Sequence, residues 1–446
     1  MKPKFHDSLP SLLALLHAAG ICVDKDIVVV RDGVGRLIVA KSDGFGESKE
    51  LALKIKSELG AYAAPIPLVY GEVAERLKSD DKLTVVTIST AAGDFTVKYV
   101  DRRIVGADWL TAPAPASDKV RRLVFASLKG GVGRSTALSV LAADLVRTGL
   151  RVLAVDLDIE APGIGFMLLP TALNVGDDRR PKYGVIDYLL ENGLNGVEDD
   201  ELSDFVGVSS FGNGYIDVIP AVGRVTDDFP ESMISKLSRA LVEDVRDNNV
   251  FGLSSQISEM IDRFSRYKDY DVILIDARAG MSEVSASPIL SLGAEVLLFA
   301  TDQPQTFRGY RYLLSHVMAH FSTSDVEAWS SWRERLTFVQ AKATASAIKR
   351  RKFRESLYNL CSEFLYNSEI LGADGEVISG GLGPAPTEVG IGIPHDATYV
   401  AFHPDYDAFD PLGDETQLDA DVYDGPFGPF LKRARAILGL APTEDS

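Results

Sequence analysis

A glycine-rich stretch contains the residues of this sequence best suited to bind an anion. It reads "LVFASLKGGVGRST" and runs over residues 123–136. Gly130, Gly131 and Gly133 allow backbone N–H groups to curl around an anion without side-chain clashes. A helix is predicted from Arg134 onward, and the first turn of a helix adds unpaired N–H groups and a favourable dipole. The pattern therefore predicts a phosphate-binding loop.

Acidic residues end two further predicted strands. "AVDLD" ends with Asp156 and Asp158, and "DVILID" ends with Asp276. One such aspartate alone is better explained as an ordinary strand-end cap, but the carboxyl ends of parallel strands share one edge of a sheet, beside the loop, and three acids occur there. Carboxylate and hydroxyl oxygens are the ligands that Mg²⁺ prefers. The spacing shows that these acids can reach the loop, where Ser135 is placed to offer a hydroxyl to Mg²⁺.

The elements that must position these residues alternate between strand and helix. Six apolar runs predict buried strands: "RRLVFASL", "RVLAVDLD", "YIDVIPAV", "DVILIDA", "EVLLFAT" and "RLTFVQAKA". Helices are predicted between or after them, at 135–148, 231–245, 254–266, 306–321 and 347–365. Continuous apolar strands alternating with helices indicate an α/β fold with a doubly wound, mostly parallel sheet.

A smaller α/β module precedes this pattern. It has predicted helices at 8–19 and 50–59 and strands within "DIVVVRDGVGRLIVA", "KLTVVTIST" and "DFTVKYVDRRIVG". The stretch "TAPAPASD" reads as a stiff linker because alternating Ala and Pro favour an extended chain. We predict an accessory domain at 1–110, a linker at 111–118, and a nucleotide-binding domain with an acidic C-terminal extension at 119–446.

Composition excludes several classes of protein. The 446 residues carry a formal net charge of −18, which disfavours nucleic acid unless a local basic patch exists. No apolar run reaches the roughly 18 residues of a membrane span. The only two cysteines, Cys22 and Cys361, lie far apart, which argues against structural zinc or an iron–sulfur site and fits a reducing, cytoplasmic setting.

The motifs together resemble a known family. "KGGVGRST", "GLRVLAVDLDIEAPG" and "YDVILIDARAG" are similar to the ParA/MinD group of deviant Walker A ATPases, and more narrowly to a subgroup whose loop reads KGGVGR. The resemblance covers about residues 121–395, including "YIDVIPA" and "GIGIPHD". It implies binding of ATP with Mg²⁺, ATP hydrolysis, and a homodimer formed when ATP binds.

The resemblance also implies a role for individual residues. Lys129 would reach across the dimer to the partner's nucleotide, Asp158 would orient the attacking water, and Gly280 would lie near the γ-phosphate. Ser135, Asp156 and Asp276 would form the magnesium site, with the two acids acting directly or through a water bound to the ion. The predicted catalytic residues are Lys129, Arg134 and Asp158. The predicted nucleotide-binding residues are Gly130, Gly131, Val132, Gly133, Arg134, Ser135 and Thr136, with Gln303 and Pro304 of "TDQPQTFRG" as weaker contacts to the base.

Arg134 departs from the main family pattern, which has a lysine against the β- and γ-phosphates. Arginine keeps the charge, but its planar fork is longer and favours bidentate contacts. We therefore expect nucleotide binding to be retained and hydrolysis to be slow, because placement of the γ-phosphate limits phosphoryl transfer. A scaffold that binds nucleotide without turnover is the alternative.

Three further stretches bear on partners. "IKRRKFR" at 348–354 is a basic run that either contacts DNA or forms a solvated helix face. "FLKRARAILGL" at 430–440 has an apolar stripe that either docks on its own domain, the favoured interpretation, or targets a membrane. "VDRRIVGADWL" at 100–110 is equally compatible with a partner surface and with local ion pairs. We expect an ATP-dependent switch that controls a protein partner, with a DNA-binding positioning ATPase as the alternative.

Overall fold

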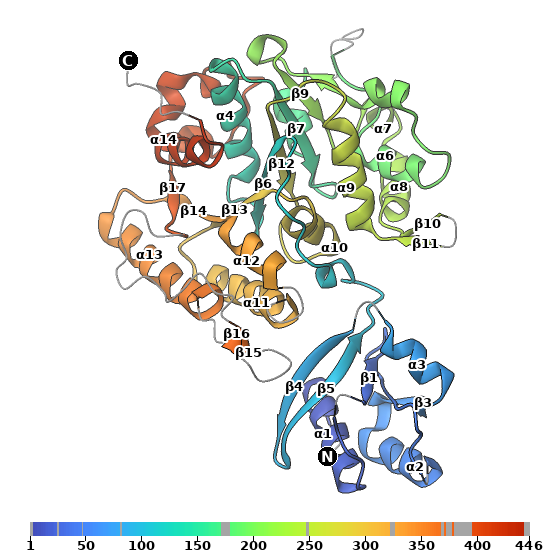
Figure 1. Ribbon diagram of the computed structural model, residues 1–446. Coiled ribbons are helices and arrows are strands. Elements are labelled where there is room, and N and C mark those ends of the chain that lie inside the picture. Colours follow the sequence, from blue (N-terminus) through green and yellow to red (C-terminus); the bar gives the residue numbers. More distant parts are fainter. Residues whose placement is uncertain are drawn as a thin grey trace. The chain divides into compact units, whose positions relative to one another are not determined.

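The computed structural model describes residues 3–24, 26–46, 48–80, 83–170, 179–246, 249–321, 326–366, 370–371, 377–378 and 395–440. Within these residues the chain divides into two compact units (Figure 1). The first comprises Met1–Leu110 with Leu371–Ile378, and the second comprises Thr111–Ile370 with Ser379–Ser446. Most of the "GIGIPHD" segment, residues 390–394, lies outside the described residues.

The first unit is a mixed five-stranded sheet with strand order β3-β2-β1-β5-β4. Its strands are β1 Val28–Arg31, β2 Leu37–Ala40, β3 Ala63–Val69, β4 Thr84–Thr90 and β5 Gly93–Asp101, and its helices are α1 Phe5–Ala18, α2 Ser48–Leu59 and α3 Glu72–Lys78. Apolar side chains of α1 and α2 bury one face of the sheet, and Ala74 of α3 packs on the other. Sequence patterning missed β3, whose two prolines disfavour a strand, and the short α3.

The second unit is built on an eight-stranded sheet with order β17-β14-β13-β6-β12-β7-β9-β8. All its pairs are parallel except β8 with β9. The strands are β6 Arg121–Ser127, β7 Val152–Leu157, β8 Gly207–Val208, β9 Ile216–Ile219, β12 Val272–Ala277, β13 Glu295–Ala300, β14 Leu336–Ala343 and β17 Thr398–Ala401. The predicted doubly wound, mostly parallel sheet is confirmed.

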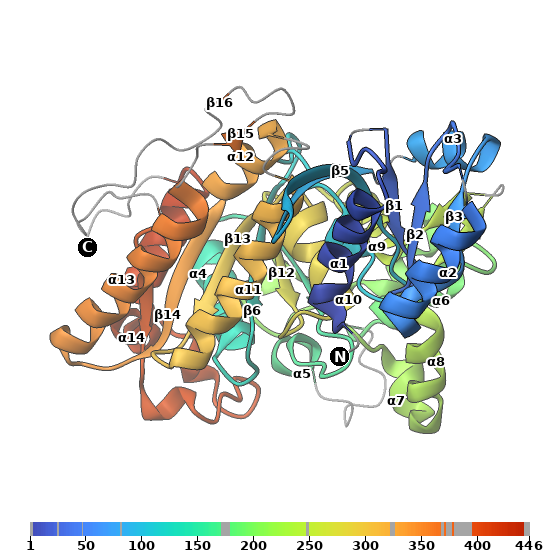
Figure 2. The same cartoon turned by 90° about the horizontal axis from the view of Figure 1, so that it is seen from below.

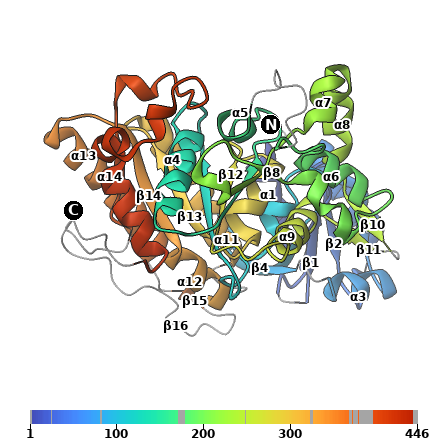
Figure 3. The ribbon, with the colours of Figure 1, turned by 90° about the horizontal axis from the view of Figure 1, so that it is seen from above.

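Helices cover both faces of this sheet. Figures 2 and 3 view the protein from opposite sides, the first with α11, α12 and α13 in front of the strands and the second with α4 and α14 in front. The helices are α4 Arg134–Arg147, α5 Ile164–Leu168, α6 Val185–Asn192, α7 Arg224–Asp228, α8 Met233–Ala240, α9 Leu253–Phe264, α10 Glu283–Ala286, α11 Pro304–Phe321, α12 Val326–Glu334, α13 Ala347–Cys361 and α14 Ala420–Ile437.

Two predicted helices were too long. The helix expected at 231–245 ends at Ala240, and Asp244–Arg246 forms strand β10, which pairs with β11 Asn249–Phe251 in a hairpin. The helix expected at 347–365 is α-helical only to Cys361 and continues as a π-helical turn, Ser362–Tyr366. Strand β10 is only three residues long, so it leaves no alternating pattern that could separate it from the helix before it.

The C-terminal apolar stripe is buried in the second unit. Phe430, Leu431, Ala434 and Leu438 of the α14 region are each at most 2% exposed and join the core formed by α4 and the sheet. Arg435 forms an ion pair with buried Asp144 of α4, with Nε 2.8 Å from Oδ2. The docking interpretation is therefore what the structure shows, because the stripe is already covered by its own domain.

The Ala/Pro segment forms backbone hydrogen bonds with the rest of the second unit. Ala114 N donates to Leu290 O at 2.8 Å, and Ser117 N donates to Gly293 O at 2.9 Å. Gly293 has a φ of +58°, and a Cβ there would lie 2.3 Å from Pro115 O. The second half of the predicted linker is thus fixed by backbone contacts that its composition did not reveal.

Candidate functional site

The glycine-rich turn joins β6 to α4 at the carboxyl edge of the sheet. Gly131 and Gly133 have φ values of +69° and +86°, in the left-handed region that favours glycine. Gly133 is the N-terminal cap of α4, and a Cβ added at either glycine would meet no atom within 4 Å. The turn is therefore open on one side, with the first turn of α4 behind it, as an anion-binding loop requires.

Arg134 points into the protein from the first turn of α4. Its side chain is 6% exposed, and its Nη2 lies 3.2 Å from Oδ2 of Asp158. Its Nη1 donates to the backbone carbonyl of Ala277, at the end of β12. In this structure, the guanidinium therefore links the residues that follow β7 to the end of β12.

Ser135 and Asp276 meet beside this link. The Ser135 hydroxyl donates to Oδ2 of Asp276. The other carboxylate oxygen of Asp276 is buried and has no hydrogen-bond partner among the described residues, and the same holds for Oδ1 of Asp158. The Ser135 hydroxyl and the Asp276 carboxylate supply the oxygen ligands that Mg²⁺ prefers. The described residues contain no cluster of three or more Asp, Glu, His or Cys side chains arranged to hold a metal ion by themselves.

Both carboxylate oxygens of Asp156 accept hydrogen bonds from backbone N–H groups. Its Oδ2 accepts from Gly163 N and Ile164 N, both at 3.0 Å, and its Oδ1 accepts from Asp158 N at 3.1 Å. It therefore shapes the loop that carries Asp158. Burial and the nearby charge of Asp276 raise the Asp156 pKa to about 8, and burial raises the Asp276 pKa to about 6.

These shifts predict that stability falls with pH. A carboxyl whose pKa is raised by folding binds its proton more tightly in the folded state, so its contribution is full below pH 3.8 and is lost as pH rises toward 8. In EDTA and without nucleotide, the free energy of unfolding of wild type should fall between about pH 5 and 8 more steeply than that of Asp156→Asn. The difference is at most about 1.4 kcal/mol per pH unit, the value for one proton.

Urea unfolding at several pH values measures this difference. The matched control is Asp269→Asn, which makes the same chemical change at an exposed position. Equal slopes for wild type and Asp156→Asn would contradict the raised pKa of Asp156.

Lys129 lies at the start of the loop, away from Arg134. Its Nζ donates to Oε1 of Gln303 at 2.7 Å, in a surface contact just before α11. Gly280, with a φ of +100°, donates its N–H to Ser127 O at 2.9 Å. The structure thus brings Gln303 to the lysine, and Pro304 is the first residue of α11.

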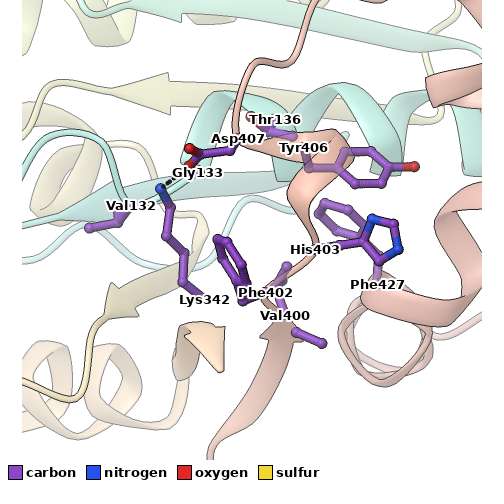
Figure 4. Close-up of a pocket in the computed structure, with 11 residues that line it drawn as sticks. Val132, Gly133, Thr136, Lys342, Val400, Phe402, His403, Tyr406, Asp407 and Phe427 are labelled. Atoms are coloured by element: carbon purple, nitrogen blue, oxygen red, sulfur yellow. Dashed lines mark hydrogen bonds and ion pairs between the residues drawn. The ribbon is translucent and has the colours of Figure 1, made fainter. Parts of the chain in front are cut away.

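A hollow beside the loop was not predicted from the sequence. The space in it that a water molecule can occupy is about 30 Å³, and the wider concavity around it is open to solvent. Its lining includes Gly133, Thr136, Lys342, Phe402, Tyr406 and Asp407. Figure 4 shows Lys342 reaching toward Asp407, and these side chains form an ion pair of 3.2 Å. Sequence patterning did not predict this hollow because β17, the strand that leads into it, is only four residues long.

A comparison with protein-family models identifies this part of the chain. Residues 123–296 match the model described as "CobQ/CobB/MinD/ParA nucleotide binding domain". This region is therefore similar to the nucleotide-binding domain of the CobQ/CobB/MinD/ParA family. The match confirms the predicted resemblance to ParA/MinD-type ATPases over these residues, while nucleotide binding by the loop and the narrower KGGVGR subgroup stay predictions.

Solved structures with a similar arrangement include members of the same family. One is an ATP complex of McdA from Cyanothece, which is 15% identical, covers 74% of this chain and 100% of that chain, and has a TM-score of 0.44. Another is MinD from Aquifex aeolicus, which is 15% identical, covers 73% of this chain and 100% of that chain, and has a TM-score of 0.40. A ParA family ATPase from Chlorobium tepidum also matches, with 16% identity over 70% of this chain and 99% of that chain and a TM-score of 0.42. No curated protein sequence matches the chain. These distant likenesses add no argument to the family match.

The basic run on α13 is partly engaged by the domain itself. Arg354 forms a bidentate pair with Asp396 at 2.6 and 2.7 Å, and Arg351 pairs with Glu355 at 3.0 Å. Arg350 lies over the Tyr399 ring, 5.2 Å from its centroid. These contacts favour a solvated helix face that pairs with local acids. In the part of the chain that the structure describes, no helix could span a membrane.

Proposed function

We propose that the chain is a Mg-ATP-dependent switch that hydrolyses ATP slowly and acts through a homodimer. The observation that supports this most is the meeting of Arg134, Asp158, Ser135 and Asp276 beside an open phosphate loop. An inert loop would need neither the carboxylates nor the hydroxyl at this edge. The proposal places the phosphates on the backbone N–H groups of residues 130–136.

Each buried acid has a separate task in this proposal. Ser135 and Asp276 hold Mg²⁺, which neutralises phosphate charge when bound. Asp156 fixes the loop that carries Asp158 through its three backbone contacts. Asp158 orients the attacking water, and its buried Oδ1 is the acceptor that we propose for it. Thr136 contacts the α-phosphate.

The base of the nucleotide is proposed to enter the hollow lined by Phe402 and Asp407. The hollow begins at Gly133 and Thr136, so a nucleotide on the loop can extend into it. Phe402 is about half exposed and offers an aromatic face. The Lys342–Asp407 pair supplies a donor and an acceptor for the edge of a base. Gln303 and Pro304 stay the alternative base contacts, because Gln303 loses its Lys129 partner if that lysine moves to a phosphate.

Lys129 is proposed to complete the site of a second chain. It lies near the surface, and its contact with Gln303 is solvent-exposed, so the side chain is free to exchange that partner for a phosphate. ATP binding would thus favour the dimer, and hydrolysis would release it. The output is a change in binding to a protein partner.

Mixing two inactive variants tests this proposal. Lys129→Ala and Asp158→Asn should each be inactive, but a hybrid dimer contains one site with both native residues. Phosphate release should therefore recover on mixing, to about a quarter of wild type, because half of the dimers are hybrid and one of their two sites is intact. Lys119→Ala, at an exposed position before β6, is the matched control and should retain full activity. No recovery at any mixing ratio would refute the shared site.

A further inference from the structure

Strand β4 forms an open edge of the accessory sheet. It ends the strand order β3-β2-β1-β5-β4 and pairs only with β5, over the full length from Thr84 to Thr90 (Figure 1). In an antiparallel pair, every second residue directs its N–H and C=O away from its partner strand. Among the described residues, no strand pairs with these outward groups of β4.

The two edges of this sheet differ in how they are protected. The opposite edge, β3, has Pro65 and Pro67, which lack an N–H, and its pairing with β2 is irregular. Strand β4 reads "TVVTIST", with no proline, no charge and an unbroken register with β5. Natural sheets usually blunt such an edge with charge, proline or a bulge, and a long flat edge invites another strand.

The sequence of β4 is complementary to itself in an antiparallel pair. With Thr87 on the twofold axis, every residue of the strand pairs, and Val86 lies opposite Ile88 of the other copy. Both side chains already pack against the core beneath α1, so pairing would continue that apolar face across the two units. On the outer face, Val85 would lie opposite Ser89.

The row of threonines on the exposed face would also continue from one copy into the other. Thr87 and Thr96 of β5 already lie with their hydroxyl oxygens 3.0 Å apart on the exposed face. Pairing about Thr87 would extend this row into the other copy, and cross-strand Thr–Thr pairs stabilise sheets. Because β4 carries no charged side chain, the pairing places no like charges directly opposite each other.

We infer that the accessory units of two copies of this chain associate through β4 in an antiparallel strand pair centred on Thr87. The pairing joins the two five-stranded sheets into one continuous sheet. It needs no nucleotide and uses a different surface from the shared ATP site proposed above, so hydrolysis would open the ATP interface while the accessory units stay paired.

Disulfide trapping tests the register. Residues opposite each other on an antiparallel pair have Cα atoms about 4.5–5.5 Å apart, within the range of a disulfide. Thr87→Cys, made together with Cys22→Ser to remove the exposed native cysteine, should form a cross-linked dimer without nucleotide. The matched control is Thr96→Cys in the same background, one strand in from the edge, which should stay uncross-linked. Equal cross-linking of the two variants would overturn the inference.

Light scattering of the full chain tests the association itself. The wild-type chain without nucleotide should have the mass of a dimer, and Thr87→Lys should have the mass of a monomer because two ammonium groups would face each other across the axis. Thr96→Lys adds the same charge to the same face and should leave the dimer intact, with circular dichroism showing that both variants fold. A monomeric wild-type chain would also overturn the inference, and a strand of another protein would then be the occupant to seek.

Discussion

Replacing Asp158 by Asn is expected to reduce ATP turnover by about 10²–10⁴-fold, the range that a positioned acid–base group typically contributes. Asn keeps the size of the side chain but loses the carboxylate that orients water. It also removes the ion pair with Arg134. Binding of a fluorescent ATP analogue should persist, because the backbone of the phosphate loop is unchanged. Steady-state phosphate release measures the loss, with Asp269→Asn as the control for the same change at an exposed carboxylate.

Arg134→Lys probes the same ion pair from its other side. In this structure the guanidinium engages both Asp158 and the Ala277 carbonyl. The shorter ammonium cannot make the same fork of contacts, so it should release Asp158 for catalysis. We expect turnover to rise by about 10- to 100-fold, since a hydrogen bond to a charged group contributes about 1.5–3 kcal/mol and about 1.4 kcal/mol is a factor of ten.

The two variants together decide between a slow enzyme and an inert scaffold. If wild type and Asp158→Asn release phosphate equally at background level, the hydrolysis proposed for this chain is wrong. If Arg134→Lys lowers turnover, arginine is the better phosphate ligand here and does not restrain Asp158.

Phe430→Ala is expected to lower the free energy of unfolding of the second unit by about 3–5 kcal/mol. The Phe430 ring is fully buried, with its centroid 6.2 Å from that of Phe125 and 6.0 Å from that of Phe299. Phe125 and Phe299 belong to β6 and β13, two neighbouring strands at the centre of the sheet. Removing the ring leaves a cavity between α14 and these strands.

Urea unfolding followed by tryptophan fluorescence measures this loss, because Trp329 and Trp332 are buried in the second unit. The matched control is Phe229→Ala, at a position 58% exposed, which should change stability by about 0.5 kcal/mol or less. A loss for Phe430→Ala no larger than that of the control would mean that α14 is only loosely attached. It would then reopen the membrane interpretation of this helix.

Local sequence patterns were sufficient for the central architecture. Long apolar strands such as Val272–Ala277 can be buried on both faces only in a sheet covered by helices on both sides, so their type and the class of fold follow from composition and length. The phosphate loop was also readable, because left-handed φ values at Gly131 and Gly133 demand glycine at fixed spacing. Short or proline-containing elements such as β3, β10 and β17 gave no comparable signal.

The sequence by itself determined that a phosphate loop and three acids share one sheet edge, since parallel strands all end on the same side. Only the tertiary structure decided how those residues are connected. It pairs Arg134 with Asp158, gives Asp156 to backbone N–H groups, and places Phe402 beside the loop although most of the second unit's chain lies between them. Such contacts depend on side-chain direction and on long-range packing, which no local pattern records. Arg134, the residue that departs from the usual loop, contacts Asp158 and Ala277, which are distant in the chain and adjacent in the fold. These contacts could not be predicted from the loop sequence alone.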